Sequence, residues 1–302
     1  NEVVKPILER GGLVSGRDFF LGFSPEREDP GNVTFHTATI PKIVSGDGAP
    51  ARQLMESFYG SFINQVVSVS SNDTAEAVKI TENVFRAVNI ALVNELKLIY
   101  EAIGIDIWEV IAAAKTKPFG YMAFYPGPGL GGHCIPIDPF YLTWKAREHG
   151  VPTRFIELAG EINTAMPRHV VAKLEEALDR RCSKTLGNAR ILILGIAYKK
   201  NVSDIRESPA LTLIELLERR GAQVAFHDPH VQEIPATREH AALAGRRAVP
   251  LVEGALAHFD AVLIVTDHDA VDYSLLATAP LVVDTRNACE SRGLHLANVV
   301  KA

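Results

Sequence analysis

The chain has 302 residues, of which 47% are hydrophobic and 22% charged, and its formal net charge is −5. This composition is typical of soluble globular proteins, and the length allows two domains. The negative charge and the lack of a long Lys/Arg run exclude a nucleic-acid partner, and no apolar stretch reaches the ~20 residues of a membrane span. The cysteines are odd in number and widely separated, which argues against a disulfide framework and favours a reducing cytoplasm; they are Cys134, Cys182 and Cys289.

The first half of the chain begins within a helical pattern at residues 1–12 and continues with short apolar runs that predict strands at 19–23, 40–45 and 66–70. A long helix is expected next, because Asp73 and Glu76 have the spacing of a capping box and no breaker follows before Gly104. Apolar residues lie nearly all around this helix. We therefore expect it to be buried on most sides, in a domain core or a subunit interface.

The second half alternates helices and strands. A helix at 106–115 precedes a loop rich in proline and glycine, and helical patterns resume from Tyr141 to about Asp179. Strands at 190–198, 223–228, 259–268 and 279–287, with a helix at 210–220, predict a parallel, doubly wound sheet. Ligands of such sheets bind beyond the carboxyl ends of the strands. The polar residues expected at that edge are Lys199, Asp204, Arg206, Asp267 and Arg286.

The loop from Tyr125 to Pro139 contains Gly127, Gly129 and Gly132 in the G-x-G-x-x-G spacing of a dinucleotide-binding loop. That motif needs a strand before the first glycine and a helix at the third, and the surrounding prolines disfavour both. We therefore predict that this loop is not a pyrophosphate cradle, and that its glycines let the backbone approach a ligand closely. Cys134 follows two residues later, and local chemistry leaves open whether it is a nucleophile or a buried structural thiol.

Four motifs together show a resemblance to a known family. They are SPEREDPGN from Ser24, EAVKITEN from Glu76, GPGLGGHCIPIDP from Gly127 and AYKKNVSDIRESPA from Ala197. In this order they resemble the UDP-glucose/GDP-mannose dehydrogenase family across the whole chain, and the cysteine loop looks most like that of bacterial UDP-N-acetylglucosamine 6-dehydrogenases.

The resemblance implies an enzyme that oxidises the C6 hydroxyl of a nucleotide sugar twice, with two NAD⁺, to a uronic acid. Cys134 would then be the nucleophile that captures the C6 aldehyde as a thiohemiacetal, which is oxidised to a thioester and hydrolysed. Lys79 and Asn83 would stabilise the oxyanion at C6, and their i, i+4 spacing puts them on one helix face. Asp138 would work with Lys79 on water and protons, and Glu26 would serve thioester hydrolysis.

The same resemblance assigns binding residues. Arg206 would reach the NAD. Nucleotide-sugar contacts are implied for Arg27, Tyr125, Gly129, Gly131, Tyr198, Lys199 and Arg286. No metal is implied, and three histidines without ligand-like spacing are interpreted as structural; they are His133, His227 and His268.

The chain departs from the family at its start, because residues 1–60 contain no G-x-G-x-x-G fingerprint. The expected α/β architecture is the remnant of a Rossmann NAD-binding domain (1–70), a central helical catalytic and dimerisation domain (71–182), and a doubly wound UDP-sugar-binding domain (183–302). About 100 residues, a domain's worth, would be absent by truncation or proteolysis. We therefore expect the chain alone to bind NAD⁺ poorly and to be inactive.

The leading substrate is a UDP-N-acetylhexosamine, with UDP-GlcNAc first. The alternatives are UDP-glucose, UDP-ManNAc or GDP-mannose dehydrogenation, or a non-catalytic module that binds nucleotide sugars and dimerises. Family members pair through the long helix, so the resemblance also implies a homodimer through the helix from Thr74. It further suggests bacterial synthesis of surface-polysaccharide precursors.

Overall fold

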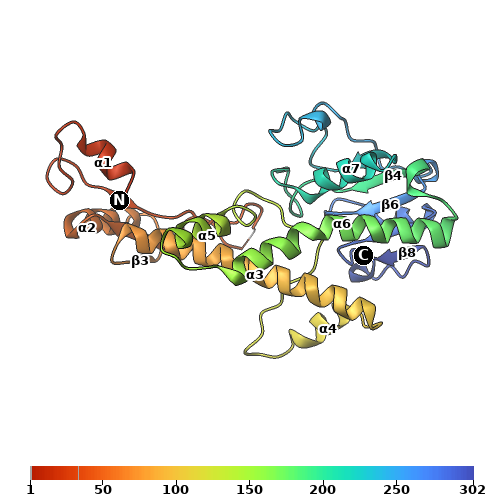
Figure 1. The fold of residues 1–302 in the computed structure, drawn as a ribbon, viewed down its shortest axis with the longest axis horizontal. Coiled ribbons are helices and arrows are strands. Elements are labelled where there is room, and N and C mark those ends of the chain that lie inside the picture. The colour runs from red at the N-terminus through yellow and green to blue at the C-terminus, as the bar shows by residue number, and fades with distance from the viewer. Residues whose placement is uncertain (1, 33) are drawn as a thin grey trace. The chain divides into compact units, whose positions relative to one another are not determined.

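The structure is a computed structural model that describes residues 2–32 and 34–302. The chain divides into two compact units, residues 1–85 and 86–302. Helix α3 (Asn72–Ala102), drawn in orange in Figure 1, passes through the boundary in sequence between them. Each unit is described by itself.

The first unit is a small sheet with one covering helix. Its strands β1 (Gly22–Phe23), β2 (Lys42–Gly46) and β3 (Val66–Ser68) lie in the order β1-β2-β3, with β1 antiparallel and β3 parallel to β2. They confirm the three predicted strands at shorter lengths. Helix α1 (Val4–Glu9) lies near the start of the chain.

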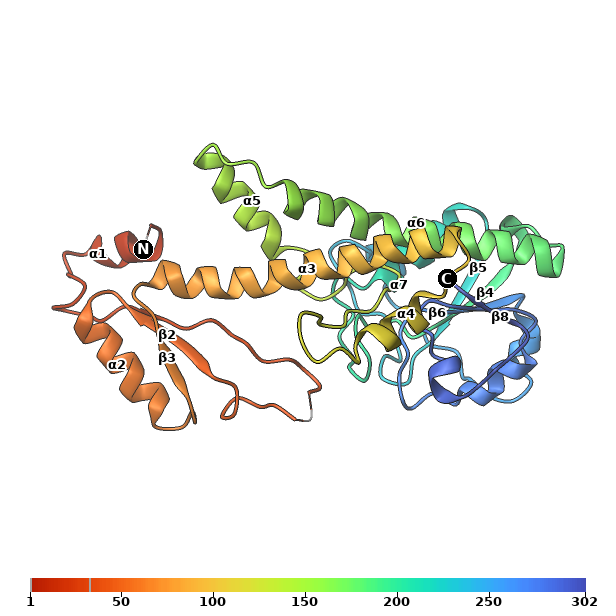
Figure 2. The same ribbon diagram turned by 90° about the horizontal axis from the view of Figure 1, so that it is seen from below.

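Helix α2 (Ala49–Gly60), which the sequence patterns did not indicate, packs beside β2 and β3 (Figure 2). The approach is close at Gly46, where an added Cβ would lie 2.1 Å from the Arg52 backbone nitrogen. Only glycine fits this contact between strand and helix.

Helix α3 is 31 residues long, as the absence of breakers predicted, but its cap differs from the expected one. The hydroxyl of Ser71 accepts a hydrogen bond from the Thr74 backbone N–H at 3.1 Å, and Asp73 lies inside the first turn. The capping box of Asp73 and Glu76 was therefore wrong. Within the single chain α3 is not buried on most sides, because large apolar side chains are exposed along it, and burial in a subunit interface stays a prediction; the exposed residues are Phe85, Leu92, Leu98 and Ile99.

The second unit continues with four helices, α4 (Ile107–Ala114), α5 (Asp138–Glu148), α6 (Arg154–Cys182) and α7 (Pro209–Arg219). Asp106 caps α4 by accepting a hydrogen bond from the Trp108 N–H at 2.9 Å. Helix α5 begins three residues earlier than predicted, because Pro139 occupies its first turn, where a missing N–H costs nothing.

A five-stranded parallel sheet forms the rest of this unit, in the order β5-β4-β6-β7-β8. The strands are β4 (Arg190–Leu194), β5 (Gln223–His227), β6 (Ala261–Ile264), β7 (Val282–Asp284) and β8 (Val299–Lys301). The order is that of a doubly wound fold, which confirms the predicted sheet. Strand β8 was not predicted.

Alternate residues of β4 face different layers. Ile191 and Ile193 belong to a core formed with α6 and α7, which lie alongside the sheet in Figure 1. Leu192 and Leu194 face a second core, which includes residues of several short 3₁₀ helices. The 3₁₀ helices are η1 (Leu186–Asn188), η2 (Ala241–Leu243), η3 (Ala255–His258), η4 (Tyr273–Thr278) and η5 (Glu290–Arg292).

Asp228, which directly follows β5, organises the loops at the carboxyl edge of the sheet. One carboxylate oxygen accepts hydrogen bonds from the N–H groups of Ile196 and Ala197 at 2.7 and 3.1 Å. The fully buried His268 lies 3.0 Å from the same oxygen. Its Nδ1 accepts an N–H from Asn201 at 2.9 Å, so the proton is on Nε2, which donates to Asp228. Burial alone would raise the pKa of Asp228, but the hydrogen bonds from His268 and from the backbone N–H groups lower it.

We predict that Asp228→Asn lowers the free energy of unfolding at pH 7 by about 3 kcal/mol, since an amide NH₂ would face buried N–H donors. Because the folded-state pKa is lowered, the wild-type contribution is present above the unfolded pKa of about 3.9 and is lost as pH falls. Urea unfolding of the wild type and the variant at pH 7 and at pH 3 measures the difference in their free energies of unfolding at each pH. A difference between variant and wild type that persists undiminished at pH 3 would contradict this account.

Candidate active site

The carboxyl edge of the sheet is where a ligand of this fold binds. Strands β4 and β6 are neighbours, and the chain leaves β4 towards β5 on one side and leaves β6 towards β7 on the other. A crevice forms at such a point of reversal. Tyr198 and Lys199 follow β4, and Arg286 follows β7, so three predicted binding residues lie on loops at this edge.

Arg286 is held in place by the backbone around it. Its N–H donates to Asp284 at 2.9 Å and its Nε donates to the Val265 carbonyl at 2.9 Å. Burial lowers the pKa of the guanidinium, which Asp267 and Asp284 oppose, and an arginine remains charged under these conditions. The guanidinium also packs on the glycine loop, where a Cβ added to Gly127 would lie 2.5 Å from Nη1.

A cavity of about 450 Å³ opens beside Arg286. Tyr125 and Arg286, which are both predicted to contact the nucleotide sugar, line this cavity together. The rings of Trp108 and Tyr125 stack with centroids 6.0 Å apart and planes at 16°. The full lining is Trp108, Ala112, Lys115, Tyr125, Pro126, Asp267, Arg286, Asn287 and Ser291.

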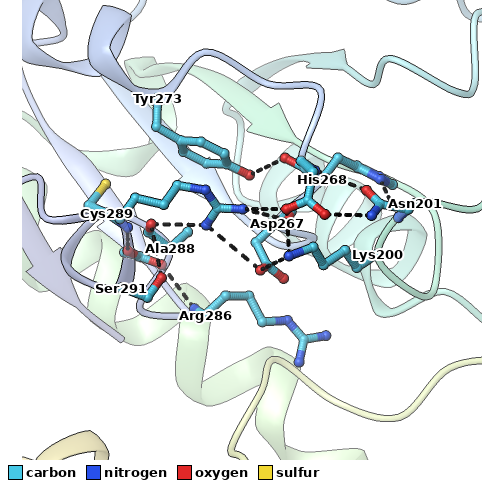
Figure 3. A network of polar contacts seen from close by, with 12 residues as sticks. Lys200, Asn201, Asp267, His268, Tyr273, Arg286, Ala288, Cys289 and Ser291 are labelled. Carbon is cyan, nitrogen blue, oxygen red and sulfur yellow. Dashed lines mark hydrogen bonds and ion pairs between the residues drawn. The ribbon is translucent and has the colours of Figure 1, made fainter. Parts of the chain in front are cut away.

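The acidic residue in this cavity is balanced by neighbouring cations. Asp267 lies 3.9 Å from Lys200 and 3.9 Å from Arg292, and the Arg292 guanidinium also covers the Tyr273 ring at 4.3 Å. In Figure 3 the Arg286 side chain extends away from this cluster. Arg286 and Lys115 therefore give the cavity a positive side that suits a diphosphate, which a planar guanidinium can bind in a bidentate manner.

The glycine loop packs against the loop that joins β4 to α7. A Cβ added to Gly131 would lie 2.7 Å from the Tyr198 Cβ, and one added to Gly129 would lie 3.2 Å from Pro209. The Gly132 N–H donates to the Arg206 carbonyl at 3.0 Å. The atoms nearest to these glycines belong to the protein, and their expected approach to a ligand stays a prediction.

The hydrogen bonds of the loop agree with the prediction that the G-x-G-x-x-G spacing is not a cofactor cradle, which stays a prediction. The N–H groups of Gly127 and Gly132 are already bonded to protein acceptors, and the next helix begins only at Asp138. A pyrophosphate cradle needs free N–H groups at a helix N-terminus.

Cys134 lies in the turn that leads into α5 and is partly exposed. Its carbonyl accepts the Asp138 N–H at 2.8 Å, so the predicted nucleophile and the predicted acid–base residue are joined by one turn. The pKa of Arg206 is raised, mainly by its hydrogen bonds to Asp204 and to a smaller extent by Cys134, which places its guanidinium within electrostatic reach of the thiol.

One further cysteine and two of the histidines lie in surroundings that fit a structural role. Burial raises the pKa of Cys289 to about 12, so that thiol is inert. His227 lies 2.8 Å from the Val249 carbonyl, and His268 is the buried partner of Asp228, which fits their interpretation as structural residues. Within residues 2–32 and 34–302, no group of three or more His, Cys, Asp or Glu could hold a metal ion.

Glu26 and Arg27 lie in the first unit and are each engaged there. Glu26 accepts the Arg27 N–H at 2.7 Å and pairs with Lys42 at 3.2 Å; burial raises its pKa, but these bonds and the Glu28 N–H together lower it. The Arg27 guanidinium donates to Glu82 at 2.7 Å and to the Pro41 carbonyl at 2.6 Å. The roles of both residues in substrate chemistry remain predictions.

Lys79 and Asn83 also lie in the first unit, on α3. Lys79 is half-buried and Asn83 is buried at 2% exposure, so neither has the exposed position of an ordinary surface residue of a helix. They lie one turn apart on the same face, as expected for a pair that acts on one oxygen.

Two buried asparagines support the glycine loop and were not found by sequence reasoning. Asn94 accepts the Gly127 N–H at 3.0 Å and donates to Asn163 at 2.9 Å, and Asn163 donates to the Ala87 carbonyl at 3.1 Å. The one available signal was a polar residue within the apolar run NIALVNELKL. Trp108 and Lys115 gave no signal, because nothing local to α4 shows which cavity it borders.

We predict that Asn94→Leu lowers the free energy of unfolding by about 2–4 kcal/mol, since it leaves the Gly127 N–H and the Asn163 Oδ1 without partners in a buried place. The matched control is Glu95→Leu, an exposed change on the same helix, with an expected effect within about 0.5 kcal/mol. Equilibrium urea unfolding compares the two. Equal effects for both variants would show that the asparagine pair does not hold the loop.

Across residues 2–32 and 34–302, the helices are too short or too polar for any of them to cross a membrane. Similarity to known proteins is found over most of the chain. Residues 73–165 match the central domain of the UDP-glucose/GDP-mannose dehydrogenase family, and residues 192–291 match the UDP binding domain of the same family.

The names of individual relatives specify different sugars. The chain is 38% identical over 237 residues to a UDP-N-acetyl-D-glucosamine 6-dehydrogenase of Pseudomonas aeruginosa, covering 78% of this chain and 56% of that protein. It is 33% identical to an NDP-N-acetyl-D-galactosaminuronic acid dehydrogenase of Ralstonia solanacearum, covering 92% and 63%. The structure of the UDP-D-ManNAc dehydrogenase of Pyrococcus horikoshii matches with a TM-score of 0.85 at 31% identity, covering 99% of this chain and 69% of that one.

The chain thus spans between about half and two thirds of the length of the curated relatives it matches. The two matched domains account for more than half of its residues, and the chain therefore belongs to the UDP-glucose/GDP-mannose dehydrogenase family.

Proposed function

We propose that this chain carries the cysteine and the nucleotide-sugar site of an NAD-dependent 6-dehydrogenase for a UDP-N-acetylhexosamine, with UDP-GlcNAc the first candidate. The observation that carries this proposal is the path of one loop. The loop borders the cavity of Tyr125 and Arg286, is fixed at Gly127 and Gly132, and then presents the partly exposed Cys134.

The cavity suggests how the nucleotide is bound. The stacked rings of Trp108 and Tyr125 offer an aromatic surface for a pyrimidine base, since bases stack on such rings. Arg286 and Lys199, on neighbouring loops at the carboxyl edge, supply positive charge for the diphosphate. The sugar would then extend along the loop, towards Cys134.

Cys134 performs the covalent step of the proposed reaction. Its thiolate adds to the C6 aldehyde and forms a C–S bond in a thiohemiacetal; loss of a hydride gives a thioester, and water cleaves the C–S bond to release the carboxylate and regenerate the thiol. NAD⁺, when bound, would supply the acceptor for the hydride lost in each of the two oxidations. Covalent capture keeps the reactive aldehyde in the site between them.

Polar side chains of this chain stabilise charge and move protons. Lys79 and Asn83 hold the oxyanion at C6, and Asp138 works with Lys79 on protons. The lowered pKa of Glu26 keeps its carboxylate ionised at neutral pH, so it can orient the water that attacks the thioester.

The described residues fit only part of an NAD site. Arg206 is mostly exposed and fits an anionic group of the dinucleotide. The glycine loop does not fit the pyrophosphate, and the N–H groups after β4 are bonded to Asp228. The described residues therefore assign no pyrophosphate cradle to this chain.

Two alternatives retain support. The names of the relatives span glucosamine, galactosaminuronic acid and mannosamine sugars, so the epimer is open among UDP-N-acetylhexosamines. A non-catalytic binding module would need only the cavity, whereas an enzyme also needs a reactive thiol. The partly exposed Cys134, set beside Arg206, favours the enzyme.

A homodimer is proposed through the exposed apolar face of α3. Leu92, Leu98 and Ile99 are 36–51% exposed in the single chain, and a stable interface would bury such side chains. The proposed domain division at residues 70 and 182 is supported by the separate family matches on either side of the second boundary. The three free cysteines suit the cytoplasm.

We predict that the chain binds UDP and UDP-GlcNAc more tightly than GDP in isothermal titration calorimetry. Arg286→Met should weaken UDP binding by about 10- to 100-fold, the loss expected for hydrogen bonds to a charged group. Cys134→Ala is the matched control and should leave UDP binding unchanged, because the thiol acts on the sugar. Tighter binding of GDP, or an Arg286→Met variant with wild-type affinity, would argue against the assigned cavity.

Light scattering at micromolar concentration tests the proposed dimer. The wild-type chain should have the mass of two copies, and the double variant Leu92→Glu/Ile99→Glu the mass of one, because two charges would be buried in the interface. Val252→Glu places a charge at another exposed apolar residue and should remain dimeric. A monomeric wild-type chain would refute the interface.

A further inference from the structure

Lys97 is a buried lysine that the proposed mechanism does not use. It lies on α3 and is only 5% exposed. Across residues 2–32 and 34–302, no hydrogen bond or ion pair to its Nζ is found. Burial lowers the pKa of Lys97 to about 8, with Glu101 and Asp284 acting in the opposite direction. A buried ammonium without a direct partner is costly, which is a reason to look for a ligand.

The acidic groups nearest to Lys97 are already paired with other cations. Glu101 pairs with Lys173 and lies 3.4 Å from His169. Asp106 pairs with Lys301 and also caps α4. Among the described residues neither carboxylate bonds to the Lys97 Nζ, and the Glu101 Oε2 is itself buried without a hydrogen-bond partner.

A cavity of about 280 Å³ lies against Lys97, separate from the one beside Arg286. It is bordered by the first residues of α4, and the N–H groups of a helix N-terminus attract negative charge. Its remaining walls include apolar side chains. The full lining is Lys97, Glu101, Gly104, Ile105, Asp106, Ile107, Trp108 and Lys301.

We propose that this cavity binds a small oxyanion, a carboxylate or a phosphate, that pairs with the Nζ of Lys97. The ammonium supplies up to three donors, and the α4 N-terminus supports the same charge. The apolar walls at Ile105, Ile107 and Trp108 favour a carboxylate on a small apolar body over free phosphate. The site is independent of the nucleotide cavity and of the proposed enzymatic function.

Trp108 provides a way to observe this site. Its indole lines both cavities and stacks on Tyr125, so a ligand beside Lys97 changes the surroundings of the ring. The other tryptophan, Trp144, is 61% exposed on α5. The Trp144→Phe variant therefore leaves Trp108 as the single indole of the chain.

The experiment titrates the Trp144→Phe chain with sodium benzoate and, separately, with sodium phosphate, at constant ionic strength set with sodium chloride. Saturable change of Trp108 fluorescence is expected at millimolar concentration, the range for one charged contact in a small pocket. Tighter binding of benzoate identifies a carboxylate ligand, and tighter binding of phosphate identifies a phosphate ligand.

Three further substitutions on the same background locate the response. Lys97→Met should weaken it at least about tenfold, as loss of a charged hydrogen bond does. Lys117→Met removes an exposed lysine and should leave the Trp108 fluorescence titration unchanged. Arg286→Met should also retain the response, which separates this site from the nucleotide cavity.

The folding of Lys97→Met is checked by its thermal unfolding midpoint, which should equal or exceed that of the parent, because methionine fills the place without a buried charge. An unchanged titration in a folded Lys97→Met variant would overturn the proposal. So would the absence of any saturable response to both anions up to about 50 mM, a limit weaker than any specific site of this kind.

Discussion

The close packing of one glycine-containing loop on the carboxyl edge of a parallel sheet is the contact on which the candidate site depends. Side chains at Gly127 and Gly131 would lie 2.5 and 2.7 Å from Arg286 and Tyr198, so neither position can carry a Cβ without displacing a neighbour. This packing sets one wall of the nucleotide cavity. It also fixes the start of the turn that carries Cys134, and thus relates the thiol to the cavity.

The arrangement of charge at the carboxyl edge of the sheet supports the proposal that a sugar nucleotide, rather than a dinucleotide, binds there. The Asp228 carboxylate binds the N–H groups after β4, which in a cofactor cradle would face a phosphate. Asp267 is balanced by Lys200 and Arg292. The cations on the cavity side are Arg286 and Lys115, so the proposed recognition depends on side chains and an aromatic surface.

Local patterns in the sequence predicted the features that depend on near neighbours. The strands β4, β6 and β7, the helix without breakers from Asn72 and the rejection of a cradle at Gly127 all follow from residues close in sequence. The pairing of Asn94 with Asn163 joins residues 69 positions apart, and the unpaired burial of Lys97 depends on packing against distant elements. The Ser71 cap was missed because Asp73 has equally good local chemistry.

Alkylation of the cysteines tests most directly whether the thiol and the cavity form one site. The chain is treated with iodoacetamide, with and without UDP-GlcNAc, and each cysteine is quantified by peptide mass spectrometry. We expect rapid modification of Cys134 that UDP-GlcNAc suppresses and UDP alone suppresses less, with the buried Cys289 unmodified in every sample. Modification of Cys134 at the same rate with and without saturating UDP-GlcNAc would contradict a shared nucleotide-sugar site.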